Sequence, residues 1–162
     1  MSDFPHSAAA PAEERPRPEP RSAYRRFVDI QTRWLDNDAY GHVNNTVYFT
    51  WFDTAVNRLL IDAGALDIRH GAAIGFAVQS HCDYFSPLAY PQPVQAGLRI
   101  GRLGASSVRY EIGIFGVGHA LAAAAGHLTH VYVDRATQRP APLTAALRAA
   151  VEGLLAGEGA YR

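Results

Sequence analysis

The sequence predicts an α+β protein in which an antiparallel sheet of five strands wraps around one long helix. From Thr46 to Ala63 the apolar residues recur at three- and four-residue steps, which is typical of a helix with one buried face. Apolar residues alternate with period two in four other segments, which are residues 24–34, 75–88, 93–104 and 106–116, and residues 119–134 are predicted as a fifth strand. One helix inserted after the first strand, and four strands after it, imply a sheet that closes around the helix.

The helix has a signal at each end. Asn44 or Asn45 can cap its first turn, and Gly64 can end it. The face that we expect it to bury consists of Tyr48, Phe52, Ala55, Leu59 and Ala63.

Two of the predicted strands, residues 75–88 and 119–134, have unusual sequences. In residues 75–88 strict alternation puts His81 and Asp83 on one face, and the other face then carries Phe76, Val78, Ser80, Cys82 and Tyr84. Residues 119–134 are rich in alanine, which favours a helix, but Gly126 and the β-branched end of the segment favour a strand, and we predict a strand. Residues 139–155 close the chain with a turn and a short amphipathic helix.

Length and composition limit the classes of protein to consider. A chain of 162 residues is long enough for one domain, which we place at residues 24–162. Residues 1–23 are rich in proline, charge and small side chains, so we expect a disordered tail whose removal up to residue 22 leaves stability and activity unchanged. Fifteen basic and fifteen acidic residues leave no basic excess for a nucleic acid or an anionic membrane. A single cysteine and the lack of an apolar signal segment predict a cytoplasmic protein.

Residues 34–45, WLDNDAYGHVNN, crowd acids, a glycine, a histidine and two asparagines between the first strand and the helix. The stretch starts like a calcium loop, but Val47 stands where a bidentate glutamate is required and Tyr40 where an oxygen ligand belongs. We therefore expect no metal. The chain also lacks a G-x-S-x-G elbow and a cysteine in a nucleophile setting, which disfavours serine and cysteine hydrolases.

The signature D-N-D-A-Y-G-H-V-N-N-T-V-Y, in its strand-loop-helix setting, resembles the hotdog-fold acyl-CoA thioesterases of the 4-hydroxybenzoyl-CoA thioesterase type. The resemblance extends over residues 24–154. It implies that Asp38 is the catalytic carboxylate, as nucleophile or general base, and that the backbone amide of Asn45 polarises the thioester carbonyl. It also implies an acyl-CoA substrate, no cofactor, and a homodimer or homotetramer whose active sites lie between subunits.

The residues support this chemistry independently. Thioester hydrolysis needs a group that attacks or activates water and a group that stabilises the carbonyl oxygen as it becomes negative. A carboxylate supplies the first, and the free N–H groups at the start of a helix supply the second. Gly41 would let the loop approach the thioester closely.

The other candidate residues are interpreted as structural, as functional or as either. His42 contacts the substrate, tunes Asp38 or only packs within the loop, and Asp36 is a structural acid. Asn44 orders the loop beside the substrate, and Tyr48 is a core residue or a ligand. His81 lines the acyl pocket or forms a structural pair with Asp83, and Cys82 is a small buried hydrophobe.

Candidates to hold the phosphates of coenzyme A are few, and they are Arg102, Ser106, Ser107 and Arg139. An acyl-carrier protein, which would need a basic patch such as Arg25 and Arg26, therefore stays open as the alternative carrier. A non-catalytic module that binds acyl thioesters, or a hotdog hydratase or dehydratase, is the alternative function.

Overall fold

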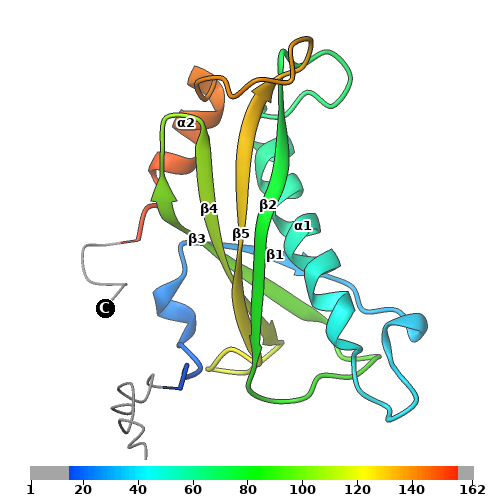
Figure 1. Ribbon diagram of the computed structural model, residues 1–162. Helices are drawn as coiled ribbons and strands as arrows, with labels where there is room; N and C mark the ends of the chain where they lie inside the picture. The colour runs from blue at the N-terminus through cyan, green and yellow to red at the C-terminus, as the bar shows by residue number, and fades with distance from the viewer. Residues whose placement is uncertain (1–14, 157–162) are drawn as a thin grey trace, which may run out of the picture.

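The structure is a computed structural model, and it describes residues 15–156. Its five strands form one antiparallel sheet in the order β1-β3-β4-β5-β2, and α1 packs across one face of it (Figure 1). The elements are η1 (Arg21–Ala23), β1 (Arg26–Ile30), η2 (Trp34–Asp36), α1 (Asn45–Asp62), β2 (Ala73–Tyr84), β3 (Val94–Leu103), β4 (Ser107–Gly116), β5 (Ala124–Asp134) and α2 (Ala145–Glu152). This is the hotdog arrangement that the sequence predicts, and the fold class is confirmed.

Helix α1 begins and ends where the sequence indicates. The side chain of Asn44 accepts a hydrogen bond from the backbone N–H of Thr46, and Gly64 adopts the left-handed conformation just after the last turn. The predicted face is buried as far as Leu59, whereas Ala63 is exposed because the helix has already left the sheet there. Trp51, Val56 and Leu60 widen the buried stripe, as expected for a helix enclosed by a curved sheet.

Strand β2 differs from the strict alternation that we predicted. Its register with β5 shifts between Ala77 and Gln79, so Val78 is the extra residue of a β-bulge. The bulge reverses the faces: Phe76 and Cys82 therefore lie on opposite faces of the sheet, and only the residues after the bulge keep their predicted side. Alternation in a sequence does not reveal an inserted residue, because the bulge changes pairing without changing composition.

The N-terminal strap, residues 15–24, is packed against the outer face of the sheet, which is the face opposite α1. The ring of Tyr24 lies over Gly97 and Gly113, which are paired across β3 and β4, and a Cβ on Gly113 would fall 2.5 Å from the tyrosine Cζ. The Glu19 carboxylate binds the Arg99 guanidinium, with Nη2 to Oε2 at 2.8 Å. The folded domain therefore starts before residue 24, and the expectation of a structureless tail is wrong for the part of it that the structure describes; residues 1–14 lie outside the described residues.

The last elements follow the predictions. β5 is a strand despite its alanines, because it is enclosed between β4 and β2 and pairs with both. Residues 119–123, which we predicted as part of this strand, are irregular, and Leu121 forms an isolated bridge with Pro20. α2 is a short helix capped by Thr144. No helix within residues 15–156 is long and apolar enough to cross a membrane.

Candidate active site

The loop between β1 and α1 is held rigid by Asp36. This carboxylate is fully buried and accepts hydrogen bonds from the Arg33 backbone N–H at 2.7 Å and from Arg33 Nε and Nη2 at 3.0 and 2.8 Å. Its backbone carbonyl accepts from the N–H of Asn44 at 2.8 Å, which ties the loop to the start of the helix. Asp36 is thus the structural acid that the sequence analysis expects.

Asp38 is the first residue of a tight turn that ends at Gly41. Its Oδ1 accepts from the Tyr40 N–H at 2.8 Å, its N–H donates to the His42 carbonyl at 2.8 Å, and its carbonyl accepts from the Gly41 N–H at 3.1 Å. Within residues 15–156 the second carboxylate oxygen has no hydrogen-bond donor, so it is available to a substrate or a water molecule. Gly41 has φ +79°, and a Cβ there would meet no atom within 4 Å, so the turn needs glycine for its backbone conformation.

The first turn of α1 presents one free amide. Asn44 Oδ1 accepts from both the N–H and the hydroxyl of Thr46, at 3.0 and 2.8 Å, and the Asn44 carbonyl accepts from the Val47 N–H. The N–H of Asn45 has no acceptor among the residues that the structure describes. It points out of the positive end of the helix dipole and is the donor best placed for an oxyanion.

One cavity of about 380 Å³ brings these groups together. It is lined by Asp38, His42, Asn45 and Tyr48 from the loop and helix, and by Tyr84 from the end of β2. The Tyr84 hydroxyl donates to the Asn45 carbonyl at 3.0 Å, and its ring meets the Tyr48 ring edge to face at 5.1 Å. Burial raises the pKa of Tyr48 to about 12 and also raises that of Tyr84, so both phenols keep their protons at neutral pH.

Tyr84 is the residue of this site that the sequence analysis missed. The alternating pattern of residues 75–88 assigned Tyr84 to one face of a strand but predicted no function for it. Only the fold shows that the end of β2 meets the first turn of α1.

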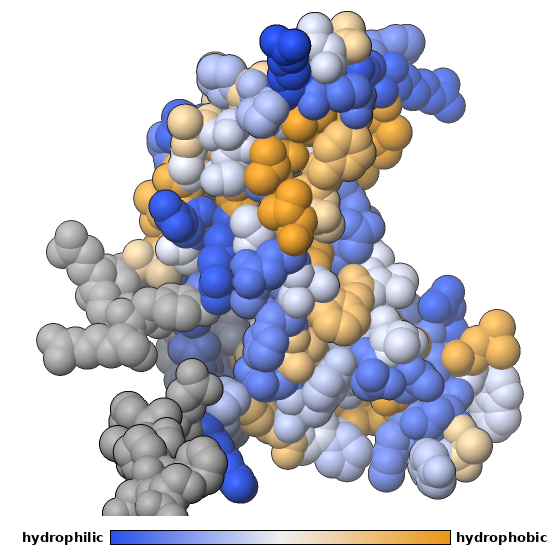
Figure 2. Space-filling model, viewed as in Figure 1, coloured by the Kyte–Doolittle hydropathy of each residue, from blue (hydrophilic) through white to orange (hydrophobic). Residues whose placement is uncertain are grey.

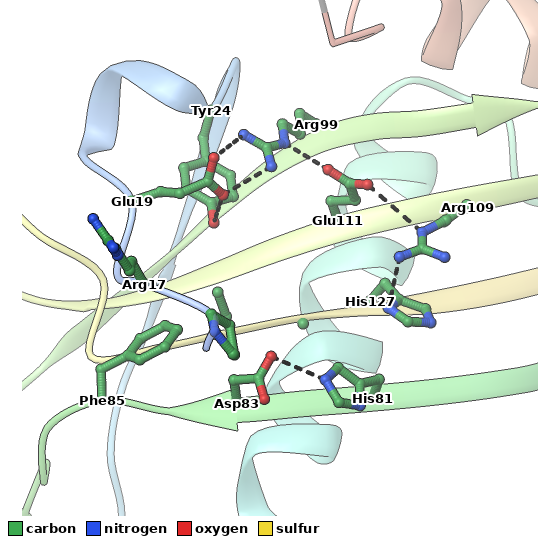
Figure 3. A pocket seen from close by; sticks show the side chains of 13 residues that line it. Arg17, Glu19, Tyr24, His81, Asp83, Phe85, Arg99, Arg109, Glu111 and His127 are labelled. Carbon is green, nitrogen blue, oxygen red and sulfur yellow. Dashed lines mark hydrogen bonds and ion pairs between the residues drawn. The ribbon is translucent and has the colours of Figure 1, made fainter. Parts of the chain in front are cut away.

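His81 does not lie in this cavity. It is on the outer face of the sheet, where its Nε2 lies 2.9 Å from Asp83 Oδ2 and its ring stacks on that of His127 (Figure 3). This is the structural pair that the sequence left as the alternative. Within one chain the structure therefore places His81 outside the cavity at Asp38.

The cavity around His81 has a volume of about 460 Å³ and is larger than the one at Asp38. Its charged groups neutralise one another in a row across the sheet, in which Arg99 lies between Glu19 and Glu111 and Arg109 lies between Glu111 and His127 (Figure 3). Burial, together with the charges of Arg109 and His81, lowers the pKa of His127 to about 4. This row holds the N-terminal strap in place, and its carboxylates, those of Glu19 and Glu111, are engaged by Arg99, so we do not assign the hydrolytic chemistry to it.

The expected phosphate-binding residues lie at the other end of the sheet. Arg102, Ser106 and Ser107 belong to the β3–β4 hairpin, and Arg139 to the loop after β5, both far from the Asp38 loop in Figure 1. The Ser106 carbonyl accepts from the Tyr132 N–H, and Arg102 and Ser107 line a small cavity of about 140 Å³. Within one chain the structure does not bring them to Asp38. No group of three or more metal-ligating side chains is found among residues 15–156.

The fold places the chain in the hotdog class. Residues 32–151 match the model of the thioesterase-like superfamily, and the chain belongs to that family. The match covers the loop, α1 and all the later strands. The narrower 4-hydroxybenzoyl-CoA type stays a prediction.

Solved structures resemble the chain over most of its length. The PA5185 protein from Pseudomonas aeruginosa is 49% identical, with a TM-score of 0.85 over 87% of this chain and 99% of that one. The PA2801 protein of the same organism is 32% identical, with a TM-score of 0.70 over 79% and 97% of the two chains. A 1,4-dihydroxy-2-naphthoyl-CoA thioesterase from Synechocystis shares the fold at 19% identity, with a TM-score of 0.71 over 77% and 93%. No curated protein sequence matches the chain.

Proposed function

We propose that the protein is an acyl-CoA thioesterase that uses Asp38 as its catalytic carboxylate. The observation that supports this best is the meeting of a carboxylate that has a free oxygen with an unpaired helix N-terminal amide in one cavity. A solved thioesterase with this fold acts on a CoA thioester, which supports CoA as the carrier.

The reaction follows from the geometry. The thioester carbonyl oxygen accepts the Asn45 N–H, which stabilises the negative charge that develops as the carbonyl carbon is attacked. Asp38 either attacks that carbon, forming an anhydride that water then hydrolyses, or removes a proton from the attacking water. In both routes the carbon–sulfur bond breaks, and the products are the free acid and the thiol. His42, exposed at the cavity rim, is a further group that contacts the substrate.

A homodimer formed through β2 would complete the site. β2 is an edge strand of 12 residues with β5 as its one partner in the described sheet, whereas the other edge, β1, has 5 residues. Its large side chains are uncovered: Val78 is 59% and Phe76 46% exposed, and Figure 2 shows apolar side chains over the upper part of this strand. An open, apolar edge of this length is a template for antiparallel pairing with a second copy.

The two-fold axis of such a pair sets the neighbours of Asp38. Antiparallel pairing centred on β2 puts the Tyr84 end of one strand beside the Ala73 end of the other. The axis is perpendicular to the sheet, so both α1 helices lie on the same side. The Asp38 cavity of one protomer then adjoins the partner's sheet end that carries Arg139, which keeps that residue a candidate for the CoA phosphates in the dimer.

The test is thiol release from a panel of acyl-CoAs, followed with a thiol-reactive dye. Asp38→Asn keeps the side-chain shape but removes the charge, so we expect kcat to fall by about 100-fold or more. Asp62→Asn, at an exposed ion pair with Arg58 near the end of α1, is the matched control and should keep wild-type turnover. Wild-type turnover in folded Asp38→Asn would exclude this mechanism, and no hydrolysis of any acyl-CoA would favour the non-catalytic binding module.

A second measurement addresses the assembly. Light scattering coupled to size exclusion should give at least twice the 17.6 kDa mass of one chain. Four times that mass would support the tetramer. An active species with the mass of one chain would refute the shared site.

A further inference from the structure

The hydroxyl of Tyr84 reaches the first residue of α1. It donates to the backbone carbonyl of Asn45 at 3.0 Å, and the residue forms part of the wall of the Asp38 cavity. Tyr84 is the last residue of β2, so this bond joins the edge strand of the sheet to the residue whose N–H we assign to the carbonyl oxygen of the thioester. Neither the signature nor the family match assigns Tyr84 a function.

Two peptide planes meet at the Cα of Asn45, and both have to be held for its N–H to keep one direction. The first plane carries that N–H, and its carbonyl, which belongs to Asn44, accepts from the Val47 N–H at 3.0 Å. The second plane carries the Asn45 carbonyl and the Thr46 N–H. This N–H donates to the Asn44 side chain at 3.0 Å, and the carbonyl accepts from Tyr84.

These bonds come from different parts of the fold. Asn44 and Val47 belong to the cap and the first turn of α1, so their bonds fix the amide only relative to the helix itself. The first turn of a helix frays readily, and such bonds move with it. Tyr84 belongs to the sheet, and its bond ties this turn to the strand that forms another part of the cavity wall.

The hydroxyl of Tyr84 has no second proton to give to a substrate. A phenol has one O–H, and here the Asn45 carbonyl accepts it. Burial raises the pKa of Tyr84 and raises that of the neighbouring Cys82 thiol to about 11, so both groups keep their protons at neutral pH. A thiol is a weak acceptor, which leaves the carbonyl as the preferred partner of the hydroxyl. Tyr84 therefore acts through Asn45.

We propose that Tyr84 is a positioning residue, whose hydroxyl holds the Asn45 amide in the direction that meets the oxyanion of the reacting thioester. The bond exists before the substrate binds, so its contribution is preorganisation. An amide that is already oriented stabilises developing charge without the cost of being ordered during the reaction. The proposal rests on the proposed function, because it concerns the same amide.

Tyr84→Phe keeps the ring and its edge-to-face contact with Tyr48 and loses only the donor. Loss of a whole oxyanion donor typically lowers kcat by about 100- to 1,000-fold. Tyr84→Phe keeps the Asn45 donor but leaves it less well oriented, so we expect kcat to fall by about tenfold. The amide binds the oxyanion more strongly than the ground-state carbonyl, so kcat/KM should fall equally and KM should change by less than about twofold.

Tyr90→Phe is the matched control. Tyr90 lies in the loop between β2 and β3, its hydroxyl makes no hydrogen bond within residues 15–156, and the variant should keep wild-type kcat. Tm and the mass from light scattering are measured for both variants, because a hydroxyl with a merely structural role would change these and leave kcat unaltered. Wild-type kcat in Tyr84→Phe would overturn the proposal. A fall in kcat that accompanies loss of the wild-type mass would also overturn it, because the hydroxyl would then act on assembly.

The carbonyl stretch of a bound thioester reports on the amide without turnover. A hydrogen bond lowers the frequency of this stretch, and infrared difference spectra with an isotope-labelled carbonyl separate it from the protein bands. The probe is the acyl-CoA of the panel that the wild type hydrolyses fastest, bound to Asp38→Asn so that it stays intact. Adding Tyr84→Phe to this variant should move the band toward its frequency in free acyl-CoA, and an unmoved band would refute the positioning role. Failure of the proposed function would instead appear as full turnover in Asp38→Asn.

Discussion

Glu19→Gln is the sharpest test of the N-terminal strap. Glu19 Oε1 and Oε2 accept from Arg99 Nη1 and Nη2 at 2.9 and 2.8 Å, and Glu111 accepts from Arg99 Nε at 2.7 Å. Burial acts to lower the pKa of Arg99, but the hydrogen bonds to both carboxylates outweigh it and raise that pKa. The substituted side chain would keep one acceptor, lose the charge and turn an N–H₂ group toward a guanidinium that also donates.

The expected cost lies between two limits. Breaking a fully buried ion pair costs about 3–5 kcal/mol, and breaking an exposed pair costs about 0–1 kcal/mol. Arg99 keeps Glu111, and the Glu19 side chain is 39% exposed, so we expect a loss of about 1–2 kcal/mol in the free energy of unfolding. For a domain of this size that corresponds to about 2–8 °C in Tm.

Calorimetry and urea unfolding measure this loss. The matched control is Glu152→Gln, whose ion pair with Arg148 is exposed and spans 3.5 Å, and which should melt with the wild type. Removal of residues 1–22 should cost more than Glu19→Gln, because it also removes the backbone bonds of the strap. The sequence alone predicted no effect for this deletion. Glu19→Gln and the longer deletion both melting with the wild type would refute the role of the strap.

Three further results are expected. Gly41→Ala and Gly64→Ala each force alanine into a left-handed conformation, and each should lower the free energy of unfolding by about 1–2 kcal/mol. Only Gly41→Ala should also lower kcat, and equal activities of the two variants would contradict an active site at the Asp38 loop. Gly113→Ala places a Cβ against the ring of Tyr24 and should lower Tm by several degrees. The control, Gly153→Ala, places its Cβ in open space and should not lower Tm. Equal Tm values for the two variants would contradict the packing of the strap against the sheet. The pKa of His127 is about 4 in the folded protein and 6.5 in an ordinary histidine, so between these pH values the unfolded chain binds more protons. Stability should therefore fall as the pH drops from 6.5 to 4. His127→Gln should reduce this pH dependence of the free energy of unfolding, measured by urea unfolding at pH 7 and pH 5, and an unchanged dependence would refute the role of His127.

Local patterns determined the class and order of the elements. The periodicity of residues 46–63, the asparagine cap and the alternating segments are properties of consecutive residues, and the structure has a helix and strands where they predicted them, although a bulge breaks the alternation of β2. The signature also located the site, because Asp38 and the first turn of the helix are only a few residues apart. That short separation is what let the sequence predict that a carboxylate and a free amide meet.

Only the tertiary structure decided the contacts between distant residues. The bulge after Ala77 places Phe76 on the outer face of the sheet. The end of β2 places Tyr84 beside Asn45, and the fold of the strap places Glu19 beside Arg99 on the sheet. None of these contacts can be recognised from the periodicity of the sequence, because each depends on how segments far apart in the chain pair and pack. The sequence by itself determined which elements form and where the candidate carboxylate lies, and the packing of those elements decided which side chains surround it.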